Sequence, residues 1–177
     1  DALPQYGTKA ADVIYECPVE GGITRMMAIY QDYSGLERIG SVRSCRLYFP
    51  KIANEFEAIY VHFGQSDFAL PYLDGGKIDN LNGIKSEGST VFYRTDDKKP
   101  PHNAFTSEKG INAGIKKKNY ETKLSADYTG HYTFAEDGKE VELTNGEDAV
   151  VVQPGYSVDK PWFVYDKKEG VYKRYEY

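Results

Sequence analysis

The sequence predicts an α/β domain with a mixed, partly parallel sheet and flanking helices, followed by an antiparallel β subdomain. Two nearly continuous apolar runs, Ile23 to Gln31 and Ala58 to Phe63, are typical of buried strands, and a helical pattern lies between them. From Tyr128 onward the pattern changes to short alternating segments separated by turn signals. We therefore divide the chain into an α/β domain of residues 1–120 and a β subdomain of residues 121–177.

Local signals place the elements of the first domain. Gly21-Gly22 precedes the first apolar run, and Ser41 and Ser44 can each cap the helix that follows it, in which Pro50 would cause a kink or a restart. Because strand, capped helix and strand follow one another, we expect a βαβ crossover with a parallel pair. The elements expected are a helical turn at Thr8–Ala11, the strand Ile23–Gln31, a helix from about Val42 to Phe56, the strand Ala58–Phe63, a short helix from Ser66 to Asp74, the strand Thr90–Arg94 and a helix capped by Ser107 that ends near Lys118.

Turn dipeptides divide the second part of the chain, and they predict an antiparallel arrangement. The expected strands are Ala149–Gln153, Trp162–Asp166 and Val171–Glu176, the last two joined by a hairpin around Lys167–Gly170.

The net charge of −5 is unevenly distributed. Residues 94–118 carry 7 basic and 3 acidic groups, whereas residues 1–93 carry 8 and 12 and residues 119–177 carry 7 and 12. An acidic protein with one basic segment does not fit generic nucleic-acid binding, which usually requires a basic face over the whole domain. We expect no nucleic-acid partner.

Tyrosine is unusually frequent, with 16 Tyr against 8 Phe and 1 Trp. A tyrosine ring can pack while its hydroxyl stays near water, so many half-buried aromatic side chains are expected. Sugar-binding extracellular proteins and ordinary sheets both have this composition.

The sequence lacks the motifs of several common kinds of functional site. No segment approaches the roughly 18 apolar residues of a membrane span. Zinc spacing, EF-hand alternation, a Walker loop, a dinucleotide glycine motif and a GxSxG elbow do not occur, so we expect neither a metal nor a cofactor. Cys17 and Cys45 could form a disulfide or be two buried thiols, and Cys45 as a nucleophile is the less favoured interpretation.

The segment Gly40 to Arg46 predicts an anion site. If the helix starts there, its unsatisfied N–H groups and dipole favour an anion, and Arg43 and Arg46 share one helix face. Two guanidinium groups could then clamp a carboxylate or phosphate, with Ser44 between them. Internal ion pairs with Glu16, Glu20 or Glu37 are the alternative.

A second cluster surrounds Gly21-Gly22. Glu16 and Glu20 could form an acid/base pair with Arg25 nearby, or an ion-paired loop without chemistry.

The histidines extend the predicted pocket. His62 ends the second apolar run, and His102-Asn103 follows the third predicted strand. Residues at the carboxyl ends of parallel strands line the crevice where open α/β sheets bind ligands. Histidine also serves as a general acid or base near neutral pH. A purely structural role for each histidine stays open.

Several separate motifs in one order resemble the YerB-like lipoproteins, a bacterial family that is a domain of unknown function. The resemblance covers nearly the whole chain and implies an extracytoplasmic protein held at the membrane only by an N-terminal lipid outside this sequence, with no known activity. Family members usually have an apolar strand before residue 1 and further β structure after residue 177, so we expect this chain to be a fragment. The motifs are ADVIYECPVEGGITRMMAIY, IGSVRSCRLYF, AIYVHFG, KKPPHNAFTS and FVYDKKEGVYKRYEY, and the positions carried over are Glu20, Gly21, Gly22, Thr24, Arg25, Gly40, Arg43, Ser44, Arg46, His62, His102 and Asn103.

Three functions follow as hypotheses. The first is a cell-envelope module that binds an anionic wall polymer or peptide, with tyrosines stacking on sugar rings. The second is a hydrolase or transferase acting on such a polymer, and the third is a scaffold without a ligand. The predicted ligand-binding residues are Arg25, Arg43, Ser44, Arg46, His62, His102 and Asn103, and the catalytic candidates are His62, His102 and Glu20.

Overall fold

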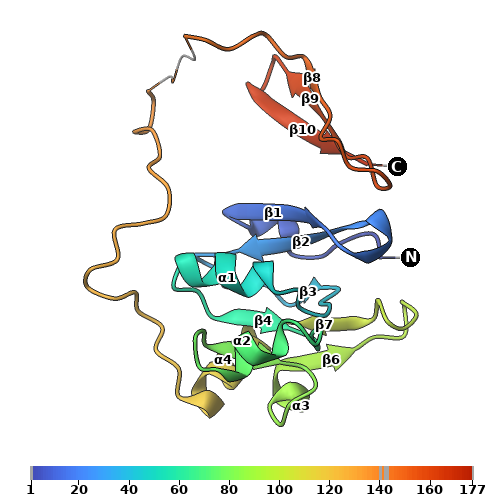
Figure 1. Cartoon of the computed structure of the whole chain (residues 1–177), viewed down its shortest axis with the longest axis vertical. Helices are drawn as coiled ribbons and strands as arrows, with labels where there is room; N and C mark the ends of the chain where they lie inside the picture. Colours follow the sequence, from blue (N-terminus) through green and yellow to red (C-terminus); the bar gives the residue numbers. More distant parts are fainter. Residues whose placement is uncertain (1, 140, 142–143, 177) are drawn as a thin grey trace. The chain divides into compact units, whose positions relative to one another are not determined.

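The computed structural model of the chain describes residues 2–139, 141 and 144–176. The chain forms two compact units, one of residues 1–14 and 27–131 and the other of residues 15–26 and 132–177. The fold is a mixed α/β arrangement with parallel and antiparallel strand pairs, as the sequence predicts (Figure 1). The hairpin of β1 (Val13–Pro18) and β2 (Thr24–Ile29), joined by the 3-10 turn η2 (Glu20–Gly22), contributes residues to both units.

The first unit holds two small sheets with helices around them (Figure 1). One sheet has the antiparallel order β3-β7-β6, and the other is the parallel pair β4-β5. Its elements in chain order are the 3-10 turn η1 (Thr8–Ala10), β3 (Ile39–Gly40), α1 (Tyr48–Glu55), β4 (Tyr60–His62), α2 (Leu70–Asp74), β5 (Asn80–Asn82), α3 (Gly88–Val91), β6 (Phe92–Arg94), β7 (Ala104–Thr106) and α4 (Glu108–Lys118).

The last helix forms as predicted and closes the core. The Ser107 hydroxyl caps α4 by accepting a hydrogen bond from the Gly110 amide at 3.2 Å, and Asn119 ends the helix in the left-handed region with φ 52°. Leu81, Val91, Phe92 and Ile111 form a buried apolar cluster between α4, α3 and the strands. This core therefore fixes β6 and the ends of β4 and β5, where the candidate site lies.

The predicted crossover between the two apolar runs is wrong. The first run forms β2, which pairs with β1 in a local hairpin, and the second forms β4, which pairs in parallel with β5. A hairpin needs only the short η2 turn, whereas a parallel return needs a long connection, so β2 takes its immediate neighbour. The parallel unit forms one step later, with α2 as its connection.

The predicted helix from Val42 starts six residues late. The backbone of residues 42–45 is extended and hydrogen-bonded to other segments, with the Val42 amide donating to the Ala104 carbonyl at 2.8 Å and the Cys45 amide to the Gly64 carbonyl at 2.9 Å. Ser41 and Ser44 therefore do not cap α1. Pro50 lies in the first turn of α1, where its missing N–H leaves no intrahelical hydrogen bond unmade.

The second unit contains the antiparallel sheet β10-β9-β8, formed by β8 (Val151–Val152), β9 (Trp162–Asp166) and β10 (Val171–Tyr175). The hairpin around Lys167–Gly170 is confirmed, and the Asp166 carboxylate accepts the amides of Lys168 and Glu169 in its turn. The described residues between α4 and β8 form neither helix nor strand. In this connection, within the first unit, Ser125 bonds the Glu57 carboxylate and His131 pairs with Glu55 at 3.3 Å.

Residues 15–26 are joined to the C-terminal strands of the second unit by an ion network. The Glu16 carboxylate accepts from Nε and Nη2 of Arg174 at 3.0 and 2.8 Å and from the Thr24 hydroxyl at 2.6 Å. The Thr24 amide donates to the Asp159 carboxylate at 2.7 Å. These bonds explain why the turn of an N-terminal hairpin belongs to a unit built mainly from the last 46 residues.

Candidate functional site

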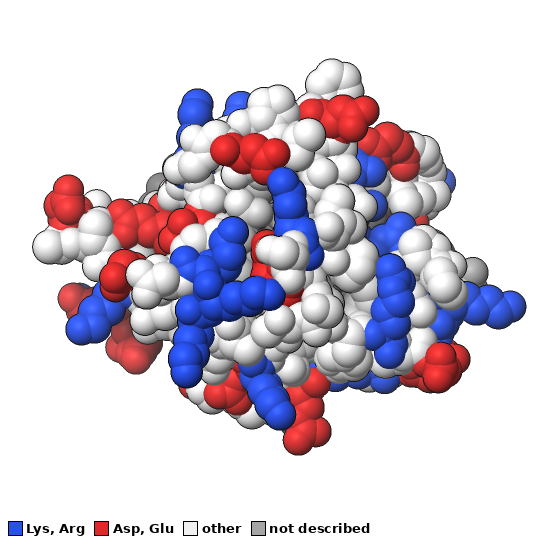
Figure 2. All heavy atoms as spheres, turned by 90° about the horizontal axis from the view of Figure 1, so that it is seen from below, with Lys and Arg blue, Asp and Glu red and all other residues white. Residues whose placement is uncertain are grey.

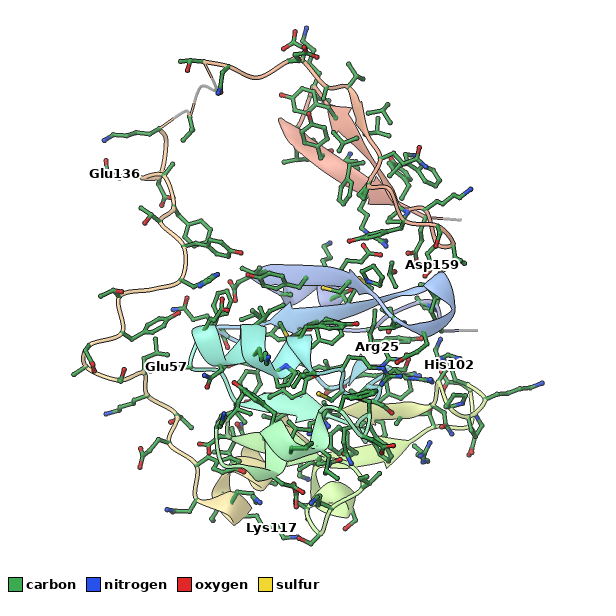
Figure 3. All side chains as sticks on the ribbon, viewed as in Figure 1. Arg25, Glu57, His102, Lys117, Glu136 and Asp159 are labelled. Atoms are coloured by element: carbon green, nitrogen blue, oxygen red, sulfur yellow. The ribbon has the colours of Figure 1, made fainter. Side chains whose placement is uncertain are left out.

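Arg43 and His102 meet in the first unit, although 59 residues separate them in sequence. Arg43 lies in the extended segment between β3 and α1, where its carbonyl accepts the Phe63 amide at 3.1 Å. His102 follows Pro100-Pro101 and lies two residues before the start of β7 (Figure 3). The distance between Arg43 Nη1 and His102 Nδ1 is 3.2 Å. Backbone pairing of both segments therefore holds the two side chains together.

This pair is cationic and has a defined proton arrangement. A guanidinium can only donate, so His102 Nδ1 accepts and the ring proton sits on Nε2. Burial, the Arg43 charge and the Lys98 charge lower the pKa of His102. Burial and the neighbouring Arg46 lower the pKa of Arg43. Within the described part of the chain, the guanidinium of Arg43 has no carboxylate partner.

Arg46 and Ser44 flank the pair but are bound to the backbone. Arg46 Nη1 donates to the carbonyls of Ser44 at 3.3 Å and Cys45 at 3.1 Å, and the Ser44 hydroxyl donates to the Phe63 carbonyl at 3.2 Å. The prediction that Arg43 and Arg46 share a helix face is wrong, because α1 begins only at Tyr48. The two charges are nevertheless close enough for Arg46 to affect Arg43.

His62 lies in the core of the first unit. Its side chain is 1% exposed, its ring stacks on Tyr60, Nδ1 lies 2.7 Å from the Gly64 carbonyl, and Nε2 lies 3.2 Å from Asn80 Oδ1. The pKa of His62 is lowered, and the main cause is the burial of its ring. An imidazole so enclosed cannot contact a polymer at the surface, so we leave His62 out of the site.

Asn103 acts through its neighbours. Its Oδ1 accepts from Arg94 Nη1 at 2.6 Å, and its Nδ2 donates to the Thr95 carbonyl at 3.2 Å. Asn103 therefore closes the loop between β6 and β7 and orients Arg94, rather than facing a ligand itself.

Glu20 belongs to the second unit, in η2. Arg25 belongs to the same unit, in β2 (Figure 3). Arg43 and His102 both belong to the first unit. Glu16, the alternative partner for the arginines, binds Arg174 instead. Both cysteines are free thiols, and Cys45 is 0% exposed, which does not suit a nucleophile.

Sequence reasoning missed Arg94. Its guanidinium carbon lies 4.8 Å from the centroid of the Phe63 ring, in a cation–π contact. A shallow cavity of about 180 Å³ lies beside this contact, lined by Phe63, Gly83, Gly88, Ser89, Phe92, Tyr93 and Arg94. Only the position of Arg94 at the end of the third predicted strand could have indicated it, because its two described partners, Asn103 and Phe63, come from other segments of the chain.

Charges of both signs cover the face shown in Figure 2, where acidic side chains lie among the Lys and Arg side chains. Among the described residues, no three His, Cys, Asp or Glu side chains are grouped as metal ligands. A search of the same residues found no helix with the length and apolar character to cross a membrane.

Comparisons with known proteins agree on one family. Residues 1–121 match the model of "Protein of unknown function (DUF3048) N-terminal domain". The chain is 37% identical over 163 residues to "Putative lipoprotein YerB" of Bacillus subtilis (strain 168), covering 90% of this chain and 49% of that protein. The crystal structure of YerB from Bacillus subtilis matches with a TM-score of 0.77 at 35% identity, covering 99% of this chain and 57% of that one.

The chain thus spans about half the length of the relatives that it matches. Similarity at this level over nearly the whole chain extends the relationship beyond residue 121. The chain belongs to the DUF3048 family and is related to the YerB lipoprotein of Bacillus subtilis.

Proposed function

We propose that this domain is a binding module of the bacterial cell envelope, which holds an anionic group of a wall polymer or peptide on Arg43 and His102, with Arg46 beside them. The observation that carries the proposal is the half-buried guanidinium of Arg43, which faces an imidazole and a second arginine but no carboxylate among the described residues. Holding like charges together in a partly desolvated place costs free energy. An anion would offset that cost.

The donors suit a phosphate or carboxylate. A guanidinium presents planar N–H groups that match two oxygens at once, and the Nε2 proton of neutral His102 adds a third donor from a different segment. Arg43 makes one described side-chain contact, through Nη1, so its other N–H groups can reach a ligand. The pair would thus recognise an oxyanion by charge and by direction.

The geometry favours binding over catalysis. The lone pair of His102 Nδ1 is occupied by Arg43, and no carboxylate is described at the ring, so His102 lacks the orienting partner of a general base. His62 is buried. A hydrolase or transferase therefore has no specific support in the first unit.

The proposed cellular location rests on the similarity of this chain to YerB. The relative's printed name describes a lipoprotein, and we extend this to the present protein. The domain would then work outside the cytoplasmic membrane, held there by a lipid, where phosphate-rich and carboxylate-rich wall polymers are present.

A thermal-shift titration tests the proposal. A ligand that binds only the folded state raises the melting temperature, and the rise grows with the logarithm of the ligand concentration above Kd. The probes are short-chain inorganic polyphosphate and poly-glutamate, which separate phosphate from carboxylate recognition. We expect at least one probe to stabilise the parent chain and to have little effect on Arg43→Gln.

The matched control is Lys99→Gln. Lys99 is exposed in the same loop as His102, and the substitution removes the same single charge without breaking a described side-chain contact. Equal loss of the shift in both variants would indicate a diffuse charge effect and refute the Arg43 site. No shift in the parent, together with a large loss of stability in Arg43→Gln, would favour the scaffold hypothesis.

A further inference from the structure

A small open cavity lies next to Arg94, and neither Arg43 nor His102 lines it. It measures about 180 Å³ and is open on one side. Phe63 and Phe92 meet edge to face, with ring centroids 5.4 Å apart at 77°, and supply two apolar walls. Tyr93 is held at its rim by a hydrogen bond from its hydroxyl to the Glu37 carbonyl at 3.0 Å.

Two glycines keep the floor of the cavity close to the aromatic wall. A Cβ on Gly83 would lie 2.2 Å from the Phe63 ring, and a Cβ on Gly88 would lie 2.2 Å from the Gly83 carbonyl oxygen. Any other residue at these positions would therefore displace Phe63 or separate the two loops. The backbone just after β5, the start of α3 and the Phe63 ring can be this close only with glycine at both positions.

Arg94 provides one oriented charge at the rim. Its Nη1 is fixed by Asn103 Oδ1 at 2.6 Å, and its plane is held over the Phe63 ring at 4.8 Å. Its Nε and Nη2 make no described contact with the protein. The guanidinium is thus preorganised at one edge and offers its remaining N–H groups to a ligand.

We propose that this cavity binds a small carboxylate with an aromatic or aliphatic body, such as the free end of a short peptide or an acylated amino acid. The carboxylate would lie against Arg94, and the apolar body would rest on Phe63 and Phe92. Aromatic walls with one directed polar group are the usual composition of small-ligand sites. The single positive charge and the absence of an acidic residue in the lining select an anion over a cation.

The test uses phenylacetate as the probe and 2-phenylethanol as its uncharged analogue. Titration of the ¹⁵N-labelled 177-residue chain should shift the amides of Gly83, Ser89 and Arg94 with phenylacetate and much less with the alcohol. Arg94→Gln should weaken phenylacetate binding by about tenfold or more, since a charge-assisted hydrogen bond is lost. Arg94→Lys should recover part of that loss.

A second variant distinguishes a loss of binding from a loss of folding. Ser89 is exposed on α3 and lines the cavity, so Ser89→Phe should fill the space and abolish binding while the remaining spectrum is retained. Lys99→Gln, which removes an exposed charge outside the cavity lining, should leave phenylacetate binding unchanged. The proposal is overturned if phenylacetate shifts no cavity amide, if the alcohol binds equally, or if Arg94→Gln and Ser89→Phe both bind like the parent chain.

Discussion

At the scale of single residues, backbone pairing brings Arg43 and His102 together from distant parts of the sequence. Arg43 and His102 meet because the Arg43 carbonyl accepts from Phe63 and the Val42 amide donates to Ala104, two residues beyond His102. Neither bond depends on the side chains themselves. The segment can therefore carry a cationic pair whose electrostatic cost is offset by strand pairing around it.

The first prediction concerns the stability of the folded domain against pH. The pKa of folded His102 is lowered, so its contribution to the free energy of unfolding is fully present above the unfolded value of about 6.5 and is lost as pH falls through the lower folded value. Urea unfolding between pH 8 and pH 5 should show stability falling with acid. His102→Gln should flatten the fall only in part, because buried His62 shifts in the same direction. An unchanged slope in His102→Gln would contradict the description of the pair.

The sequence predicts Arg43 and His102 as site members but not the geometry in which they meet. The motif positions are visible in the sequence, yet their pairing depends on an extended segment where local signals predict a helix. Ser41 and Ser44 are good caps by type, and tertiary pairing of residues 42–45 outweighed that preference. The polar atoms of Asn103 and His62 are hydrogen-bonded inside the fold, which no local pattern encodes.

At the scale of elements, the capped helix α4 is the best-predicted part of the fold. Its boundaries follow from Ser107 at the start and the lysines near its end, which are strong local signals. By contrast, the apolar runs correctly predict β2 and β4 as strands, but the strand partners predicted for them are wrong. Apolar runs indicate burial, whereas pairing is decided by which neighbour the chain reaches with the shortest connection.

The packing of α4 against α3 gives the second prediction. A Cβ on Gly110 would lie 2.3 Å from the Val91 carbonyl oxygen, a backbone atom that cannot move without disturbing α3. Gly110→Ala should therefore lower the free energy of unfolding by about 1–3 kcal/mol, even though alanine favours helices. Lys109→Ala, on the exposed side of the same turn, should change it by less than about 0.5 kcal/mol. Chemical denaturation measures both, and a neutral Gly110→Ala would mean that the helices pack less closely than described.

At the scale of the whole molecule, the two units do not follow chain order. The second unit takes residues 15–26 from the N-terminal hairpin through the bonds of Glu16 and Thr24. A division by composition places the change near residue 120 and has no means of detecting such a long-range contribution. The ion pair of Glu16 with Arg174 bridges 158 residues of sequence.

That arrangement gives the third prediction. The Glu16 side chain is 12% exposed and bonded at both oxygens, so Glu16→Gln should destabilise the second unit by about 1–3 kcal/mol. Hydrogen exchange should show faster exchange in β9 and β10 and no change in α4. Glu169→Gln, which breaks an exposed pair with Lys173, should have almost no effect. Equal exchange in the two variants would argue that Glu16 does not hold the unit together.

The most direct test of the anion-binding proposal is the pKa of His102, measured by side-chain NMR without and with short-chain polyphosphate. The free protein should show the Nε2 proton tautomer and a pKa below the usual value, because burial and the nearby charges of Arg43 and Lys98 lower it. An anion bound between Arg43 and His102 should raise that pKa clearly, and Arg43→Gln should remove most of the rise. A His102 pKa that is the same with and without saturating polyphosphate and poly-glutamate would contradict the proposal.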